Sequence, residues 1–451
     1  MPTIRNLIAL TLVLFSSACF AVEIQPLAPF TKDDRVLIMA PHPDDETIAV
    51  AGVIQRAKKA GAEIKVVCFT NGDHNELSFI VYEKRLTLKS GEFIHMGEVR
   101  RNETISAMKS LGLGGQDLVF LGYPDFGTME ILTKYWGDAK PYKSLLTKQS
   151  RVPYPDCLSP GAPYVGESIL SDIEKVLLDF RPTKIFVSDP VDSNRDHRAL
   201  YLFMHIALWD LEGKMPGPEV YPYLIHVIGW PMPRGYHPEL SIDVPEQLKD
   251  NAVSWRTLAL TGAEVEAKRD AISLYKSQIE YAPSYLFTFA RKNELFGEYY
   301  PIKLRDNKSG ETDWQQTTLP SVGGEKEDEK SYIKGLAYAE KNGEFLIKMF
   351  LSRKISFDFE VVISLLGYRK DRDFSSMPKV SLNVGAGGLR LKEKKQSVFI
   401  KDVRLDYQND SPVLKIPLKV LGNPSRLLIS VNAHKTELPF DETAWRIIEF
   451  Q

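Results

Sequence analysis

Two kinds of apolar pattern divide this chain, and the change between them near residue 300 limits what it can fold into. Up to Pro301, short apolar runs alternate with segments whose apolar residues recur at helical spacing. Such alternation predicts a mostly parallel sheet with helices on both faces. After Lys330, short strand-like runs separated by Asn-Gly, Gly-Gly and Asn-Pro turn signals predict a small all-β sandwich.

The first pattern predicts five strands and five helices. The strands are expected at residues 35–40, 63–70, 117–122, 184–189 and 223–230, and the helices at 47–59, 98–111, 168–180, 197–211 and 264–278. Residues 129–163 interrupt the pattern without a clear period. A loop of that length is usually functional or mobile, so we expect either a substrate-facing loop or a surface insertion.

The N-terminus has the features of an export signal. Arg5 precedes an apolar stretch at residues 7–15, and small residues lead to Ala21. This order predicts a signal peptide over residues 1–21 and a secreted or periplasmic protein. A membrane anchor is a weaker alternative because the apolar run is short. Cleavage before Cys19 with lipid attachment is another alternative.

Length and composition indicate how the chain divides into domains and which classes of protein are excluded. A chain of 451 residues is too long for one ordinary domain. We predict a catalytic domain at residues 33–303, a polar linker at 304–330 and the β-sandwich at 331–451. The net charge of −2 gives no basic excess for nucleic acid, and no later segment is apolar for long enough to span a membrane. The sequence does not indicate an oligomeric state.

Three polar segments follow strands of the predicted sheet: PHPDDE, TNGDH and DPVDSNRDH. In open α/β sheets the ligand lies beyond the carboxyl ends of the strands, so these segments are expected to converge. His42 and Asp45 can supply two metal ligands, and the best candidate for a third is His197. Asp44 is the candidate general base, and Asp196 can orient a neighbouring group. The alternative is that Asp44 or Asp45 only caps the following helix.

These residues resemble the PIG-L/LmbE-like family of zinc-dependent N-deacetylases. PHPDDE looks like the opening motif of that family, and VRRNETISAMKSLGL, FLGYPD, DSNRDHRAL and KRDAISLYKSQ with ELF agree in order and spacing. The resemblance covers roughly residues 33–301. It implies a Rossmann-like fold, Zn²⁺ held by His42, Asp45 and His197, and Asp44 as general base.

Other roles follow less directly from the resemblance. Asp125 is expected to hold a sugar hydroxyl, or else to form a turn. Arg100 is expected to contact the substrate, or else to pair with Glu103. Asp73 is placed at the rim of the site.

The chain departs from the family at Asn194, where a histidine commonly stands three residues before the last ligand. Asn194 can donate a hydrogen bond to the oxyanion but cannot act as a protonated acid. Either Asp44 carries the proton alone, or His226 or His237 substitutes for the missing group.

The sequence therefore predicts a zinc hydrolase that removes an N-acetyl group from an amino sugar or an N-acetylglucosamine-containing glycoconjugate. The alternative is a carbohydrate-binding protein that keeps the metal site but has lost turnover, with the sandwich as its binding module. Asn194 favours this alternative, whereas the absence of an obvious row of exposed aromatic residues in the predicted sandwich disfavours it.

Overall fold

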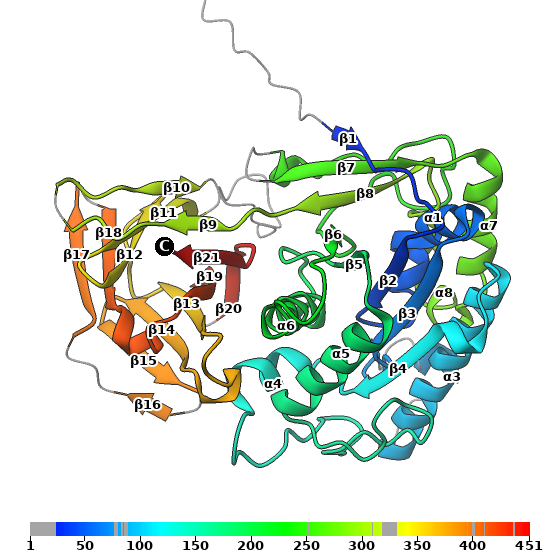
Figure 1. Cartoon of the computed structure of the whole chain (residues 1–451), viewed down its shortest axis with the longest axis horizontal. Helices are drawn as coiled ribbons and strands as arrows, with labels where there is room; N and C mark the ends of the chain where they lie inside the picture. Colours follow the sequence, from blue (N-terminus) through cyan, green and yellow to red (C-terminus); the bar gives the residue numbers. More distant parts are fainter. Residues whose placement is uncertain are drawn as a thin grey trace, which may run out of the picture.

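The computed structural model describes residues 24–451 except 76–79, 83, 85–88, 250–252, 309, 318–331, 395, 399–401, 410 and 436–437. The predicted signal peptide lies outside these residues. Figure 1 shows two units side by side, a mixed α/β unit and a unit made of strands. No helix in the described part of the chain is long and apolar enough to cross a membrane.

One eight-stranded sheet organises the first unit, in the order β1-β7-β8-β6-β5-β2-β3-β4. The five strands from β6 to β4 run parallel, whereas β8 is antiparallel to its neighbours β6 and β7. The strands are β1 (Ile24–Pro26), β2 (Arg35–Ala40), β3 (Glu63–Thr70), β4 (Leu118–Tyr123), β5 (Lys184–Ser188), β6 (Glu219–Tyr223), β7 (Ser254–Ala259) and β8 (Asn293–Glu298). Nearly every side chain of β2 is buried, as expected of a central strand covered on both faces.

Helices cover both faces of this sheet (Figure 1). One core includes side chains of α1, α3 and α7, and the other includes side chains of α4, α5 and α6. The helices are α1 (Asp45–Ala60), α3 (Ser90–Ser110), α4 (Thr128–Lys134), α5 (Gly166–Phe180), α6 (Arg195–Asp210), α7 (Gly262–Ile272), α8 (Lys276–Ile279) and α9 (Pro283–Phe287). The predicted fold class, an α/β sheet followed by further β-sheets, is confirmed.

The helix predicted at 264–278 is divided into α7 and α8, and β7 and β8 were not predicted. Two further segments differ from the prediction. The fifth strand ends at Tyr223, where the prediction starts it, and residues 224–230 form a loop in which Leu224, Ile225, Val227 and Trp230 are buried and Ile228 is exposed. The backbone N–H groups of Ile225 and His226 donate to the Asp192 carboxylate instead of to a neighbouring strand. Apolar residues alone do not distinguish a buried loop from a strand.

The segment 129–163 is packed onto the core at several side chains, and none of its residues lines the cavity beside His42 and Asp45. Its first turns belong to α4, and Trp136, Tyr142 and Tyr154 are buried in the core beside α5 and α6. The Trp136 indole donates to the Leu132 carbonyl at 2.5 Å. These aromatic side chains anchor the segment to the core.

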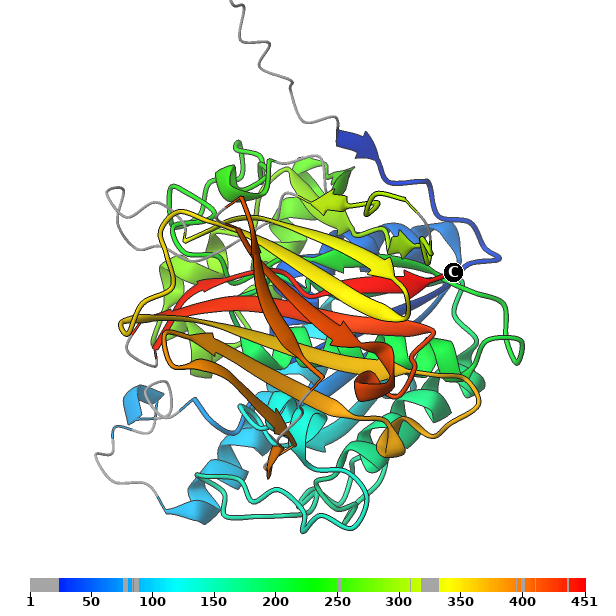
Figure 2. The ribbon, with the colours of Figure 1, turned by 90° about the vertical axis from the view of Figure 1, so that its left-hand side faces the viewer.

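The second unit consists of two sheets that share a core. Their orders are β10-β11-β12-β18-β17 and β16-β15-β14-β13-β19-β21-β9, with β20 paired to β19. The core joins Leu336 and Ile347 of one sheet to Ile363 and Leu382 of the other. Figure 2 shows these strands in front of the first unit. The strands are β9 (Ile302–Leu304), β10 (Gln315–Thr317), β11 (Ile333–Lys341), β12 (Glu344–Leu351), β13 (Phe359–Tyr368), β14 (Lys379–Gly385), β15 (Gly388–Glu393), β16 (Gln396–Val398), β17 (Arg404–Gln408), β18 (Ser411–Pro417), β19 (Arg426–Lys435), β20 (Leu438–Glu442) and β21 (Arg446–Phe450).

The described part of the predicted linker at 304–330 contains structure that belongs to this unit. β10 pairs with β11 in antiparallel register, and β9 pairs in parallel with β21. The three residues of β10 are polar and partly exposed, which is common in an edge strand. Their composition therefore resembles that of a linker.

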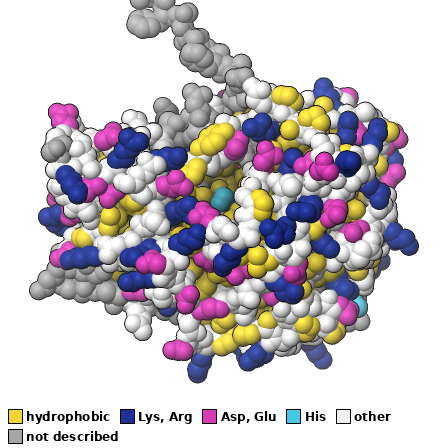
Figure 3. Space-filling view, in the orientation of Figure 1, with side chains coloured by type: hydrophobic (Ala, Val, Ile, Leu, Met, Phe, Trp, Pro, Cys, Tyr) yellow, Lys and Arg dark blue, Asp and Glu magenta, His cyan; other side chains and the backbone are white. Residues whose placement is uncertain are grey.

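The two units are packed against each other through a shared apolar cluster. Tyr368 contacts Trp209 with ring centroids 5.0 Å apart, and its hydroxyl donates to Asp210 at 2.9 Å. Trp445 of the second unit is buried, and its backbone N–H donates to the Pro190 carbonyl. In the space-filling view of Figure 3, charged side chains surround a hollow near the middle of the face where the units meet.

Candidate active site and metal centre

The carboxyl ends of four neighbouring strands carry the polar residues of the site. His42 and Asp45 follow β2, Asp73 follows β3, Asp125 follows β4, and His197 lies in the first turn of α6 after β5. β2, β3, β4 and β5 are adjacent and parallel, so their carboxyl ends lie at one edge of the sheet.

Three side chains meet there as a group that can hold a metal ion. One Asp45 carboxylate oxygen, Oδ2, lies 3.2 Å from His42 Nδ1 and 3.2 Å from His197 Nε2. Ligand atoms from the three residues all lie within 4.8 Å of one another, and all three residues are buried. His42, Asp125 and Asp196 form a second such group, and Asp192, His197 and His226 a third.

The hydrogen bonding of His197 indicates that this group fits a cation. Both of its ring nitrogens are buried without an aligned hydrogen bond, although each lies 3.2 Å from a carboxylate oxygen. Two imidazoles and a carboxylate are a common ligand set of zinc. The carboxylate facing the other ring nitrogen is Asp192, in the place of the outer partner that metal-binding histidines usually have.

Asp192 is a residue of this site that was not predicted from the sequence. Its Oδ2 faces His197 Nδ1 and also accepts hydrogen bonds from the backbone N–H groups of Ile225 and His226. Ile225 and His226 lie on a different segment of the chain from Asp192. The only signal in the sequence was therefore that Asp192 is a carboxylate five residues before His197.

Asp44 has an unusual backbone conformation next to the metal group. Its φ is 119°, and although it occupies the N-cap position of α1, its side chain makes no capping hydrogen bond to the helix. The Asp44 N–H donates to Glu46 Oε2 at 3.1 Å, and Glu46 also accepts a hydrogen bond from the Tyr275 hydroxyl. Strained backbone held by several contacts is typical of functional sites.

Burial raises the pKa of Asp44 to about 8, against the opposing effect of Arg100. Arg100 lies 3.4 Å from Asp44 Oδ2 and donates to the carbonyls of Gly72 and Pro43. Glu103, the alternative partner, instead accepts hydrogen bonds from Ser277. Arg100 therefore holds Asp44 and the loops that flank it, while its side chain also lines the cavity.

Asp196 and Asn194 both have protein partners. Asp196 accepts hydrogen bonds from the backbone N–H groups of Phe126 at 2.6 Å and Thr128 at 3.1 Å, which ties α6 to the loop before α4. Asn194 is the N-cap of α6, and its Oδ1 accepts from the Asp196 N–H at 2.8 Å. Only the amide nitrogen of Asn194 remains to donate into the cavity.

Asp125 lines the cavity beside the metal group, whereas Asp73 does not. Asp125 Oδ1 is 3.2 Å from His42 Nε2, and Oδ2 accepts from the His74 N–H. Burial by itself raises the pKa of Asp125, but the adjacent His42 lowers it overall. Asp73 accepts from the Tyr154 hydroxyl at 2.7 Å, and burial raises its pKa to about 7. Asp73 is not among the residues that line the cavity, so it supports the loop behind it.

The cavity over this group has a volume of about 220 Å³. Phe126 and Tyr281 line it and are 55% and 45% exposed, so each offers an aromatic face at its mouth. His226 and Tyr285 also line it, with His226 Nδ1 3.0 Å from the Tyr285 hydroxyl. His237, the other candidate substitute, contacts the Arg234 carbonyl and is not among the residues lining the cavity.

A parallel α/β sheet with a histidine and carboxylate centre at its carboxyl edge defines the first unit as a candidate metalloprotein domain. Residues 37–208 match the PIG-L family, described as GlcNAc-PI de-N-acetylase. The chain therefore contains a PIG-L family domain, as the sequence motifs predicted.

Individual relatives agree with this family. The chain is 35% identical over 80 residues to a 1D-myo-inositol 2-acetamido-2-deoxy-alpha-D-glucopyranoside deacetylase of Rhodococcus opacus, and this alignment spans 18% of the chain and 26% of the relative. A protein of the same description from a Mycobacterium species is 25% identical over 55% of the chain and 76% of its own length. The chain thus spans about a quarter of the first relative and about three quarters of the second.

Among solved structures, the N,N'-diacetylchitobiose deacetylase of Pyrococcus horikoshii is similar to this chain. The two are 20% identical, with a TM-score of 0.33, and the match covers 55% of the chain and 72% of that protein.

Proposed function

We propose that this protein is a secreted or periplasmic, zinc-dependent hydrolase that removes an N-acetyl group from an amino sugar or an N-acetylglucosamine-containing glycoconjugate. The observation that carries the proposal is the convergence of His42, Asp45 and His197 at one sheet edge, with Asp44 facing the same cavity. Membership of the domain in the PIG-L family supports it, since the curated relatives are described as deacetylases of an acetamido sugar linked to inositol.

In this proposal His42, Asp45 and His197 hold the metal ion. A divalent cation in such a site supplies Lewis acidity for the acyl oxygen and for water. Asp192 fixes the orientation of the His197 ring from the opposite side, and Asp196 keeps the start of α6 against the loop that carries Asp125.

Asp44 carries the proton transfers. It accepts a proton from the attacking water and returns it to the nitrogen of the leaving amine, because a carboxylate with a raised pKa can serve in both directions. Arg100 and Glu46 hold it in place through the contacts described above.

Two groups are placed to donate a hydrogen bond to the acyl oxygen in the absence of the family's usual histidine. One is the amide nitrogen of Asn194, and the other is His226, which lines the same cavity. Burial lowers the pKa of His226 to about 4, so the ring is neutral near pH 7. In the tautomer whose Nδ1 accepts from the Tyr285 hydroxyl, its Nε2–H is the donor to the acyl oxygen. Phe126 and Tyr281 offer stacking surfaces for a sugar ring at the cavity mouth.

The proposal is tested with the purified mature chain, by metal analysis and by acetate release from N-acetylglucosamine, its oligomers and N-acetylglucosamine linked to inositol. We expect one Zn²⁺ per chain and acetate release that a chelator abolishes and added Zn²⁺ restores. Bound zinc without acetate release from any of these compounds would instead favour the carbohydrate-binding alternative. A chain that binds no metal would contradict both readings.

Export is tested separately by expressing the full sequence and determining the N-terminus of the mature protein. We expect a secreted or periplasmic protein that begins at Val22. A mature chain that begins with a lipid-modified Cys19 would support the lipid-anchor alternative. A chain that keeps Met1 and stays in the cytoplasm would contradict export.

A further inference from the structure

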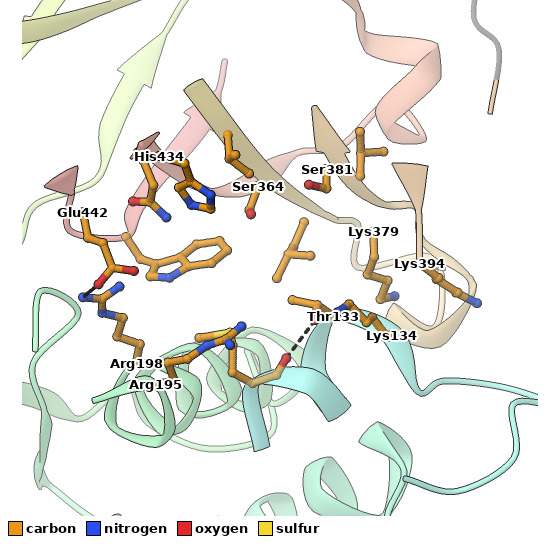
Figure 4. A pocket seen from close by; sticks show the side chains of 16 residues that line it. Thr133, Lys134, Arg195, Arg198, Ser364, Lys379, Ser381, Lys394, His434 and Glu442 are labelled. Atoms are coloured by element: carbon orange, nitrogen blue, oxygen red, sulfur yellow. Dashed lines mark hydrogen bonds and ion pairs between the residues drawn. The ribbon is translucent and has the colours of Figure 1, made fainter. Parts of the chain in front are cut away.

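A second cavity lies between the two units, and we call it the interface cleft. Its volume is about 280 Å³, and its walls come from α4 and α6 on one side and from β13, β14, β19 and β20 on the other (Figure 4). The first turn of α6 contributes to both cavities. Asn194 lines the active-site cavity, whereas Arg195 and Arg198 line the interface cleft.

Positive charge dominates the lining of the cleft. Five cationic side chains line it, and Glu442 is the single carboxylate among the lining residues; the cations are Lys134, Arg195, Arg198, Lys379 and Lys394. Glu442 pairs with Arg198 at 3.0 Å. Glu130, outside the lining, pairs with Lys134 at 2.6 Å and with Arg195 at 3.5 Å. These two carboxylates leave an excess of positive charge in the cleft.

Lys379 is the most informative of these side chains, because it is only 2% exposed and has no carboxylate partner among the described residues. Its ammonium group donates to the carbonyls of Phe374 and Met377 and faces the ring of Trp136. An ammonium has three donors, so one remains. Burial lowers the pKa of Lys379 to about 7.

Burial without a counter-charge disfavours the protonated form of Lys379, which is why its pKa is lowered, and a bound anion would stabilise that form. Arg198, which is 3% exposed, is buried at the same cleft. Arginine and lysine together are the usual ligands of phosphate and carboxylate groups. Thr133, Ser364, Ser381 and Asn432 add neutral hydrogen-bonding groups to the walls.

We propose that the interface cleft binds a small molecule that carries an oxyanion group, a phosphate or a carboxylate. The volume of the cleft is close to the lower end of the range for small-molecule sites and too small for a folded partner. This proposal does not depend on the deacetylase activity, since it concerns other residues and another ligand.

Calorimetric titration of the mature chain tests it, with inorganic phosphate, glucose 6-phosphate and glucose as probes. Glucose lacks the acetamido group, so binding in the active-site cavity does not dominate the signal. We expect both phosphates to bind and glucose not to bind. Lys394→Glu is expected to weaken phosphate binding by about tenfold.

The matched control is Lys392→Glu, which makes the same charge change on an exposed residue of β15 outside the lining. We expect its phosphate affinity to equal that of the unaltered chain, and thermal unfolding checks that both variants fold. Tighter binding of glucose 6-phosphate than of phosphate would identify a sugar-bound oxyanion, and equal binding a free one. Absence of phosphate binding, or equal weakening by the two substitutions, would overturn the proposal.

Discussion

Replacement of Asp44 by asparagine is expected to lower kcat for acetate release by about 10²- to 10⁴-fold while the metal content stays unchanged. Asparagine has nearly the same shape as aspartate, so the substitution makes the smallest possible change at a position whose φ is 119°. It keeps the N–H that donates to Glu46, but it cannot take a proton from water at neutral pH. Steady-state kinetics together with metal analysis of the same sample measure both quantities.

A second variant separates loss of the base from loss of the metal. His197→Ala removes a candidate ligand and is expected to lose both the bound metal and the activity. His95→Ala, which alters an exposed histidine of α3, serves as the matched control and is expected to keep both. If Asp44→Asn keeps more than about a tenth of the activity, Asp44 is not the base.

The second large effect is expected on stability, from Glu294→Ala. Lys268 and Glu294 form an ion pair of 2.7 Å in which both side chains are fully buried. The Glu294 carboxylate also accepts hydrogen bonds from the N–H groups of Gly52 and Val53, just after Val50 interrupts the helical geometry of α1. Glu294 thus serves as the cap of the second half of α1.

Removal of this carboxylate leaves an unpaired buried ammonium and two unpaired N–H groups. We expect the free energy of unfolding to fall by about 3–5 kcal/mol, measured by urea denaturation. Glu298→Ala is the matched control on the same strand, because Glu298 pairs with Arg256 at 3.4 Å in a partly exposed position. Its effect is expected to stay below about 1 kcal/mol. Equal effects of the two substitutions would contradict the role assigned to Glu294.

The parallel strands were predictable because their signal is local. β2 and β3 contain the apolar runs VLIMA and VVCF, and β5 ends within one residue of its predicted bound. Because the carboxyl ends of parallel strands share an edge, the convergence of His42, Asp45 and His197 also followed from the order of the elements.

Contacts between distant segments were not predictable in this way. Asp192 contacts the loop at residues 224–226, and Asp196 contacts the loop before α4. The sequence of neither loop indicates which carboxylate it contacts. That the side-chain oxygen of Asn194 caps α6 was also not predicted. Helix capping depends on which residue begins the helix, and α6 begins two residues before the predicted bound.

The pairing of β9 with β21 limits how the second unit could be exchanged for another domain during evolution. β9 follows the α/β unit directly and lies parallel to the last strand of the chain, with Ile302 opposite Ile448. Trp209 and Tyr368, from the two units, share one apolar cluster. The sandwich is therefore not an interchangeable module that a gene fusion could replace intact. A domain that replaced the sandwich would have to provide both a strand that pairs with β9 and an aromatic surface that packs against Trp209.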